Sequence, residues 1–331
     1  MKYTTLGSTD INASRICLGC MGFGETGTMH DWTVDKKRSA EIVKYALDLG
    51  INFFDTANVY SAGTSEEYLG AALKDVPRDK VVIATKVYWN EGALSRKAIL
   101  REIEGSLKRL GTDYVDLYII HRFDYETPIE ETLETLHGLI VAGKVRALGA
   151  SAMYGYQFHN MQICARDNGW PQFSSMQNHY NLLYREDERE LIPICKQTNV
   201  SLTPYSPLAA GRVARKEWKT DTLRSRTDRV SAAKYDSTEE QDKTIARRVV
   251  ELAEKRNVPI AQIALAWLFG KGVAAPIVGA VKEKYIQDAV GALDVDLTQE
   301  EIAYLEEPYV PHKIVGALSD NPPWDSVLIK K

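Results

Sequence analysis

INFFDTANVY, residues 51–60, is the stretch of sequence that decides how this chain is expected to fold. It begins as a strand, because Ile51, Phe53 and Phe54 are apolar and favour a pleated, half-buried surface. The strand gives way to a short polar run that starts at Asp55, and Tyr60 follows five residues later. A carboxylate at the end of a buried strand and a phenol just beyond it can enter the same cleft.

The next two strand-like runs also end on polar residues. VVIAT, residues 81–85, is followed by Lys86, and VDLYII, residues 115–120, is followed by His121. In a barrel of parallel strands, the carboxyl ends of the strands form the face where the active site is built. The sequence therefore predicts that a carboxylate, a phenol, an ammonium and an imidazole meet at one face of the fold.

The rest of the chain alternates between strand-like and helix-like segments. Strands are expected at residues 16–19, 52–55, 80–86, 115–120, 145–151, 172–177, 201–205 and 275–278. Helices are expected around 40–47 and at 65–73, 95–110, 128–142, 156–167, 185–198, 243–255, 260–269 and 284–292. This alternation predicts an α/β fold of the (β/α)8 TIM-barrel type, for which 331 residues are enough. A doubly wound sheet is the alternative, but no G-x-G-x-x-G follows the first strand.

No linker rich in Pro, Gly or Ser divides the chain, so a single domain is expected over residues 1–331. It comprises an N-terminal hairpin at 1–15, a polar insert at 212–243 and a C-terminal tail at 308–331 that contains Pro322-Pro323-Trp324. The insert carries many Arg and Lys residues against few acids. It could fold over the phosphates of a cofactor, or it could be a solvated surface loop, and the sequence favours neither interpretation.

Composition excludes several classes of function. A net charge of −4 gives no basic footprint for nucleic acid or for a membrane surface, and no run approaches the ~20 apolar residues of a membrane span. Cys17 and Cys20 form a C-x-x-C, but no second pair or Cys/His cluster completes a metal site. We expect no metal, and we interpret the four cysteines as reduced, mostly buried thiols of a cytoplasmic protein.

The strand-end residues allow two interpretations. Asp55 and Lys86 could form an ordinary salt bridge, with Tyr60 and His121 as structural residues. Alternatively, the Lys86 ammonium lowers the pKa of the Tyr60 phenol, and Asp55 holds Lys86 charged and in place. The placement of all four residues at the ends of successive strands favours this second interpretation, a site for general acid chemistry.

Several segments resemble a known family. GINFFDTANVY, ATKV and VDLYIIHR look like the three signature segments of the aldo-keto reductases, and LGCMGFGE, MQNHYN and YSPLAAG resemble further family segments. The chain looks most like the branch that contains bacterial general-stress reductases and potassium-channel β subunits. The resemblance implies reduction of a small aldehyde or ketone with NADP(H), or with NAD(H). Tyr60 would be the general acid, tuned by Lys86 and Asp55, and His121 would orient the carbonyl.

The resemblance also implies which residues hold the cofactor and the substrate. The cofactor-binding candidates are Cys20, Met21, Ser151, Gln177, Tyr205, Ser206, Leu208, Gly211, Arg212, Gly279, Lys282, Lys284 and Asp288. Trp32, Tyr88, Trp89 and Phe123 are candidates for the substrate pocket. The chain departs from the family where many relatives have Ser-Asn instead of Ser151-Ala152, and at Val281, Tyr285 and Ala289 in the adenosine segment. NADPH is favoured chiefly by the family, with Lys282 and Lys284 as local support.

Other functions remain alternatives. A cofactor-binding regulatory or sensor module with little turnover would use the same fold, whereas a lyase or isomerase would leave MQNHYN and YSPLAAG unexplained. Among the remaining histidines, His179 lies near the cofactor segment, and His159 and His312 are expected at the surface. The sequence leaves the oligomeric state open.

Overall fold

The computed structural model describes residues 1–315 and 318, and a sheet of parallel strands lies at its centre. Within these residues eight strands lie side by side in the order β10-β3-β4-β5-β6-β7-β8-β9. They are β3 (Cys17–Gly19), β4 (Phe53–Asp55), β5 (Val82–Val87), β6 (Val115–Ile120), β7 (Val145–Ser151), β8 (Phe173–Gln177), β9 (Ser201–Leu202) and β10 (Ile277–Gly279). The edge strands also meet, because the Ile277 amide of β10 donates to the Pro204 carbonyl just beyond β9, at 2.9 Å. This closure confirms the predicted (β/α)8 barrel.

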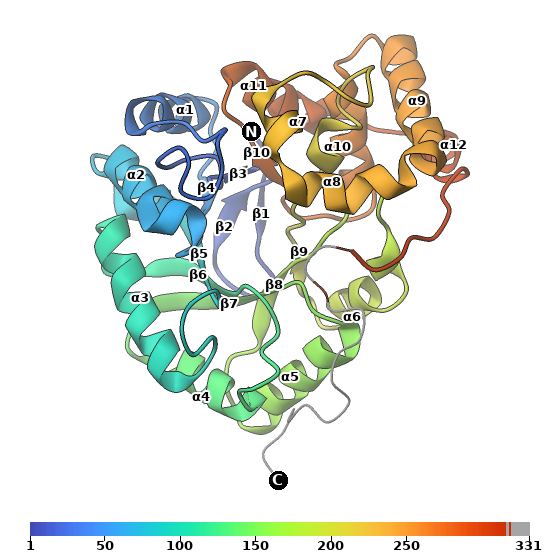
Figure 1. Ribbon diagram of the computed structural model, residues 1–331. Coiled ribbons are helices and arrows are strands. Elements are labelled where there is room, and N and C mark those ends of the chain that lie inside the picture. The colour runs from blue at the N-terminus through green and yellow to red at the C-terminus, as the bar shows by residue number, and fades with distance from the viewer. Residues whose placement is uncertain (316–317, 319–331) are drawn as a thin grey trace.

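Helices surround the barrel and cover its outer face (Figure 1). They are α1 (Lys36–Asp48), α2 (Thr64–Leu73), α3 (Arg96–Leu110), α4 (Ile129–Val141), α5 (Gly155–Asp167), α6 (Leu191–Gln197), α9 (Glu239–Arg256), α10 (Ile260–Gly270) and α11 (Glu283–Gly291). The apolar face of α3 illustrates why they pack there. Ile99, Ile103, Leu107 and Leu110 recur at helical spacing, and all four are buried in the core shared by helices and sheet.

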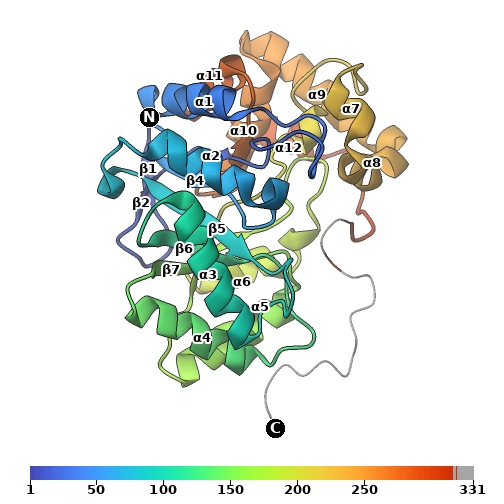
Figure 2. The same cartoon turned by 60° about the vertical axis from the view of Figure 1, so that its left-hand side comes forward.

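A second, smaller core fills the inside of the barrel. The hairpin strands β1 (Tyr3–Thr5) and β2 (Asn12–Ser14) pair antiparallel, and Leu6, Ile11 and Ala13 join the inward-facing strand residues. Figure 2 shows the hairpin at one end of the barrel and the segments after β9 at the other end. The hairpin therefore closes the amino-terminal end of the barrel and leaves the opposite face free for a site.

Two predicted elements are shorter than expected. The predicted helix at 185–198 is a 3-10 turn at Glu186–Glu188 followed by α6, because a continuous helix would place Pro193 in its interior, whereas α6 holds it in the first turn. The predicted strand at 201–205 is regular only at Ser201–Leu202, although the Tyr205 amide still donates to the Asn178 carbonyl at 2.9 Å. Pro204 has no amide hydrogen to donate towards β10.

Two other predictions were incomplete or wrong. The helix α12 (Gln299–Glu306) was not predicted, although Thr298 and Glu301 form a capping box at its start. His312 was expected at the surface, but its side chain is only 3% exposed and its Nε2 lies 3.0 Å from Asp242 Oδ1. The part of the predicted tail that contains Pro322-Pro323-Trp324 lies outside the described residues.

The polar insert is folded rather than a plain loop. It contains α7 (Leu223–Thr227), α8 (Arg229–Tyr235) and the beginning of α9. Trp218 and Tyr235 are buried within it, and Arg224 lies 4.3 Å from the ring centre of Trp32 in the loop after β3. The interpretation as a simple solvated loop is therefore wrong.

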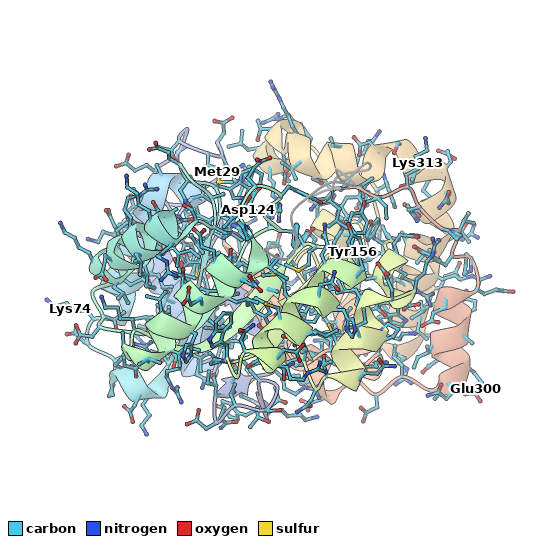
Figure 3. All side chains as sticks on the ribbon, turned by 90° about the horizontal axis from the view of Figure 1, so that it is seen from below. Met29, Lys74, Asp124, Tyr156, Glu300 and Lys313 are labelled. Carbon is cyan, nitrogen blue, oxygen red and sulfur yellow. The ribbon has the colours of Figure 1, made fainter. Side chains whose placement is uncertain are left out.

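Figure 3, which shows the molecule from below, places Met29 and Asp124, from the loops after β3 and β6, towards the same edge of the picture as Lys313. Lys74 and Glu300 lie lower in that view. In the described part of the chain, no helix is long and apolar enough to cross a membrane, and no cluster of His, Cys, Asp and Glu could hold a metal ion. All four cysteines are free and buried, as predicted.

Candidate active site

Lys86 is the centre of a hydrogen-bonded group at the carboxyl ends of β4 and β5. Its side chain is 0% exposed, and Nζ donates to Asp55 Oδ1 at 2.6 Å and to the Thr56 carbonyl at 2.7 Å. Nζ also donates to Tyr60 Oη at 3.2 Å. The other carboxylate oxygen of Asp55 accepts from Gln177 Nε2 at 2.8 Å. The predicted Asp, Lys and Tyr thus form one connected network.

A strained turn holds Tyr60 over this network. The 3-10 turn Tyr60–Gly63 includes Ser61 and Ala62 in the left-handed region, with φ of 46° and 54°. Such values are costly for residues other than glycine and persist where the surroundings enforce them. Gly24 allows the approach from the other side, because a Cβ there would lie 2.6 Å from Ser61 Oγ. The fold therefore stores strain where it positions the phenol.

Burial decides the protonation of Tyr60. Burial raises the pKa of the phenol, the Lys86 charge partly offsets this, and Asp55 raises it again. Lys86 does lower the pKa of the phenol, as predicted, but the loss of hydration outweighs this contribution and the net direction is upward. Burial alone lowers the pKa of Lys86, but Asp55 and then Tyr60 raise it, and the net direction is upward. The pair is thus a protonated phenol beside a charged ammonium.

His121 lies next to Tyr60 and is uncharged. The two rings are 5.9 Å apart in an edge-to-face arrangement. Burial, followed by the charges of Lys86 and Arg122, places the pKa of His121 well below its usual value. Its Nδ1 is buried and has no hydrogen-bond partner among the described residues. A neutral imidazole here has one N–H group, which can donate a hydrogen bond to a ligand.

A cavity of about 1600 Å³ lies above these residues. It exceeds the ~300–1,000 Å³ of a usual small-molecule site, so it has room for two ligands. The predicted residues in its wall are Met21, Trp32, Asp55, Tyr60, Trp89, His121, Ser151, Gln177, Tyr205, Ser206, Leu208, Gly211, Gly279, Lys282, Lys284 and Asp288. The sequence therefore identified residues from the loop after β3 to helix α11 that one cavity brings together.

Five other predicted residues do not line this cavity, and one of them is Lys86, which is fully buried behind Tyr60 and Asp55. Cys20 is fully buried in the core beside β3, and Phe123 is buried with its ring edge against Tyr125. Tyr88 packs edge-to-face on Trp89, which does reach the cavity. Arg212 points into the insert.

The Arg212 guanidinium is occupied by the insert itself. It donates to Ser231 Oγ at 2.8 Å and to Asp236 at 2.7 Å, and it lies over the ring of Tyr235. Arg212 therefore ties the insert together and does not line the cavity, and its buried Nε has no hydrogen-bond partner among the described residues.

The far half of the cavity has backbone and charge suited to phosphate. Ser206, Ala209 and Ala210 have positive φ values of 53°, 48° and 53°, and such conformations form concave backbone surfaces that bind anions. Lys282 and Lys284 also line the cavity, and neither makes an ion pair within residues 1–315 and 318. At Gly279, by contrast, a Cβ would meet no atom within 4 Å, so close packing does not explain that glycine.

The cavity wall holds further cations. Sequence reasoning missed Arg122, whereas the others belong to the basic insert that was expected either to cover the cofactor phosphates or to be a solvated loop: Arg215, Lys216, Arg224 and Lys234. Arg122 follows His121 directly, so its position beyond a strand end was a usable signal. Lys234 lies on α8, and nothing local in the sequence indicates that this helix lies over the cavity.

The closed barrel and its cavity define a protein that can hold a large ligand over a buried Lys–Tyr pair. Comparison with known proteins gives the class: the chain belongs to the aldo/keto reductase family, whose sequence model matches residues 15–309. Members of this family are oxidoreductases that act on small carbonyl compounds and generally use nicotinamide cofactors. The resemblance to the family is thereby confirmed.

Curated relatives match along nearly the whole chain. A versiconal hemiacetal acetate reductase of Aspergillus parasiticus is 42% identical over 340 residues, covering 95% of this chain and 98% of the relative. A putative aryl-alcohol dehydrogenase of Schizosaccharomyces pombe is 41% identical, covering 96% of this chain and 98% of the relative. An aldo-keto reductase of Alternaria alternata is 41% identical, covering 93% and 91%. These relatives are fungal, and the resemblance to the bacterial and channel-subunit branch stays a prediction.

Proposed function

We propose that this protein reduces aldehydes or ketones to alcohols with NADPH, and that Tyr60 supplies the proton. The observation that carries the proposal is the position of Tyr60 Oη. Tyr60 lines the cavity, and its Oη lies 3.2 Å from the fully buried ammonium of Lys86. A salt bridge that served only structure would not need a phenol held by a strained turn at a cavity wall.

Each residue of the group has a role in moving one proton. The bound dihydronicotinamide would supply a hydride to the carbonyl carbon. As negative charge develops on the carbonyl oxygen, Tyr60 Oη donates its proton, and Lys86 Nζ stabilises the phenolate that remains. Asp55 and the Thr56 carbonyl keep the ammonium in place. The neutral His121 donates to the carbonyl oxygen and orients it.

The residues in the cavity wall fit the proposed cofactor. Ser151 and Gln177 offer polar groups beside the acid, and Ser151 Oγ donates to the Gln177 backbone carbonyl at 2.8 Å, which joins the ends of β7 and β8. The backbone of 206–211 suits a pyrophosphate. Lys282 and Lys284, which form no ion pair with a described residue, suit a further phosphate on the ribose. This last feature favours NADPH over NADH.

The substrate end of the cavity is aromatic. Trp32 and Trp89 line it together with Tyr60 and His121. Flat aromatic walls favour aromatic substrates, because offset stacking adds to the burial of apolar area. The name of the aryl-alcohol dehydrogenase relative agrees with this chemistry. We therefore include aromatic aldehydes among the proposed substrates.

The test is to titrate purified protein with NADPH and NADH and then to measure turnover of a panel of aromatic and aliphatic aldehydes. Tighter binding of NADPH that weakens in Lys282→Ala/Lys284→Ala, with turnover of aldehydes, is the expected result. NADPH binding without turnover would favour a regulatory or sensor module. Absence of dinucleotide binding would contradict both functions.

A further inference from the structure

Two cations near Tyr205 line the cavity and form no ion pair with any described residue. Arg122 follows His121 at the end of β6, and Lys234 lies near the end of α8. Both line the cavity that also contains Tyr60 and His121. They come from segments far apart in the sequence, so the fold itself brings them to one end of the cavity.

These two cations contact a backbone carbonyl and aromatic rings instead of carboxylates. The Arg122 guanidinium donates to the His121 carbonyl at 2.8 Å and lies 5.4 Å from the ring centre of Trp89. Lys234 Nζ lies 4.5 Å from the ring centre of Tyr205. Within residues 1–315 and 318 neither cation forms an ion pair, whereas the buried Lys86 and Arg212 are paired with Asp55 and Asp236.

This arrangement is electrostatically unfavourable when the cavity holds no anion. Lys234 is only 9% exposed, and burial followed by the charge of Arg122 lowers its pKa to about 8. Burial also lowers the pKa of Arg122. The acid that faces Lys234 is Asp228, which forms an ion pair with Arg224. Unpaired buried charges are costly, and a bound anion would remove the cost.

We propose that Arg122 and Lys234 form an anion-binding subsite that selects carbonyl substrates carrying a carboxylate on the same molecule. This inference rests on the proposed reductase function. The two cations lie over Trp89 and Tyr205 at the Tyr60 end of the cavity, whereas the phosphate-binding features lie around 206–211 and 282–284. The substrate class that fits is an aromatic aldehyde with a carboxylate on its ring, since a guanidinium can hold a carboxylate through two parallel hydrogen bonds.

The experiment compares two aldehydes that differ mainly in charge, 4-formylbenzoate and its neutral methyl ester, at saturating NADPH. Wild-type kcat/KM is expected to be about 10- to 100-fold higher for the carboxylate, the range of one or two charged hydrogen bonds. Arg122→Gln should bring the ratio of the two values close to one. Arg122→Lys should retain part of it, because the charge stays and the fork geometry is lost.

Lys234→Gln should lower the ratio to a smaller extent than Arg122→Gln. Arg226→Gln is the matched control, because Arg226 is an exposed insert cation on α7, paired with Asp221 and absent from the cavity wall among the described residues. It should leave the ratio unchanged. Calorimetric titration with benzoate gives a second measurement that needs no turnover.

The outcomes separate this subsite from the proposed function. If no aldehyde is reduced but benzoate binds in an Arg122-dependent manner, the reductase proposal fails and the subsite stands. If both aldehydes are reduced equally well and benzoate does not bind, the subsite is overturned. It is also overturned if Arg122→Gln and Lys234→Gln weaken NADPH binding without changing the substrate ratio, because the cations then serve the cofactor phosphates.

Discussion

Tyr60 Oη is the only atom to which the proposed reaction assigns a proton transfer. Tyr60→Phe removes that hydroxyl and keeps the ring packed against His121, so NADPH affinity should stay nearly unchanged. The rate of aldehyde reduction should fall at least ~10²-fold, the lower range for general acid catalysis. Tyr3→Phe is a suitable control, because it removes a tyrosine hydroxyl that donates to the Gly50 carbonyl in the N-terminal hairpin region. Near wild-type turnover by Tyr60→Phe would mean that another group is the acid.

Lys86 controls the pH at which Tyr60 loses its proton. Reduction needs the protonated phenol, so activity declines as pH rises through the pKa of Tyr60. The Lys86 charge lowers that pKa against the effect of burial. Lys86→Met should therefore reduce the rate and move the alkaline limb of the residual kcat profile to higher pH.

Folding of the Lys86→Met variant must be checked by NADPH binding and thermal unfolding. Among the described residues Asp55 then keeps Gln177 as its one side-chain partner, and a buried carboxylate without a cation is destabilising. Lys80→Met, an exposed lysine ahead of the same strand, is the matched control. A normal rate with an unshifted profile would show that Lys86 and Tyr60 are not coupled.

Local sequence predicts which residues stand at strand ends but not what surrounds them. Asp55, Lys86 and His121 were predicted because each closes an apolar run. The direction of the Tyr60 pKa was missed because burial depends on the whole fold. Arg122 was visible in the sequence, yet only the structure shows that no acid pairs with it within the described residues.

At the scale of elements, Gly70 sets how closely α2 packs on α3. A Cβ at Gly70 would lie 2.8 Å from the Leu110 Cα and closer still to its carbonyl group, which is backbone and cannot rotate away. Gly70→Ala should therefore lower the free energy of unfolding by roughly 1–3 kcal/mol, despite the better helix propensity of Ala.

Gly138→Ala provides the matched control for this helix contact. Gly138 lies in α4, and a Cβ there would meet no atom within 4 Å, so this change should stabilise by up to ~1 kcal/mol. Urea unfolding midpoints at unchanged m values would measure both changes. Equal effects of the two substitutions would show that α2 and α3 do not pack through Gly70.

Element boundaries were predictable where the pattern is local. The predicted bounds of β6 and β7 agree with the structure, because β6 is a continuous buried run and β7 is buried except at Arg146. The prediction of one continuous helix at 185–198 was wrong, because it rested on helical periodicity and did not allow for Pro193, which is tolerated only in the first turn of α6. Both outcomes follow from single residues.

At the scale of the molecule, the alternation of strands and helices was enough to predict the barrel, but not the place of the insert. Arg224 of the insert lies over Trp32, and these residues are far apart in the chain. No local pattern encodes that contact. The sequence therefore left two interpretations of residues 212–243 open, and the structure shows that part of this segment forms a wall of the cavity.

We expect the insert to open when the cofactor is absent and to be protected when NADPH is bound. The helices α7 and α8 have five and seven residues, too short to be stable alone, so they depend on contacts with the rest of the cavity. Limited trypsin digestion is a direct probe, because Lys219, Arg226 and Arg229 are exposed and mobile segments are preferred cleavage sites.

Saturating NADPH should slow cleavage at these three residues more than at exposed lysines of the outer helices. Arg224→Gln removes the contact with Trp32 and should speed cleavage of the cofactor-free protein. Arg226→Gln removes one trypsin site and should leave the cleavage rate at Lys219 and Arg229 unchanged. If the insert must open to release the cofactor, Arg224→Gln should also speed cofactor release and leave the chemical step unchanged. Identical digestion with and without NADPH would show that the insert lines the cavity without closing over the cofactor.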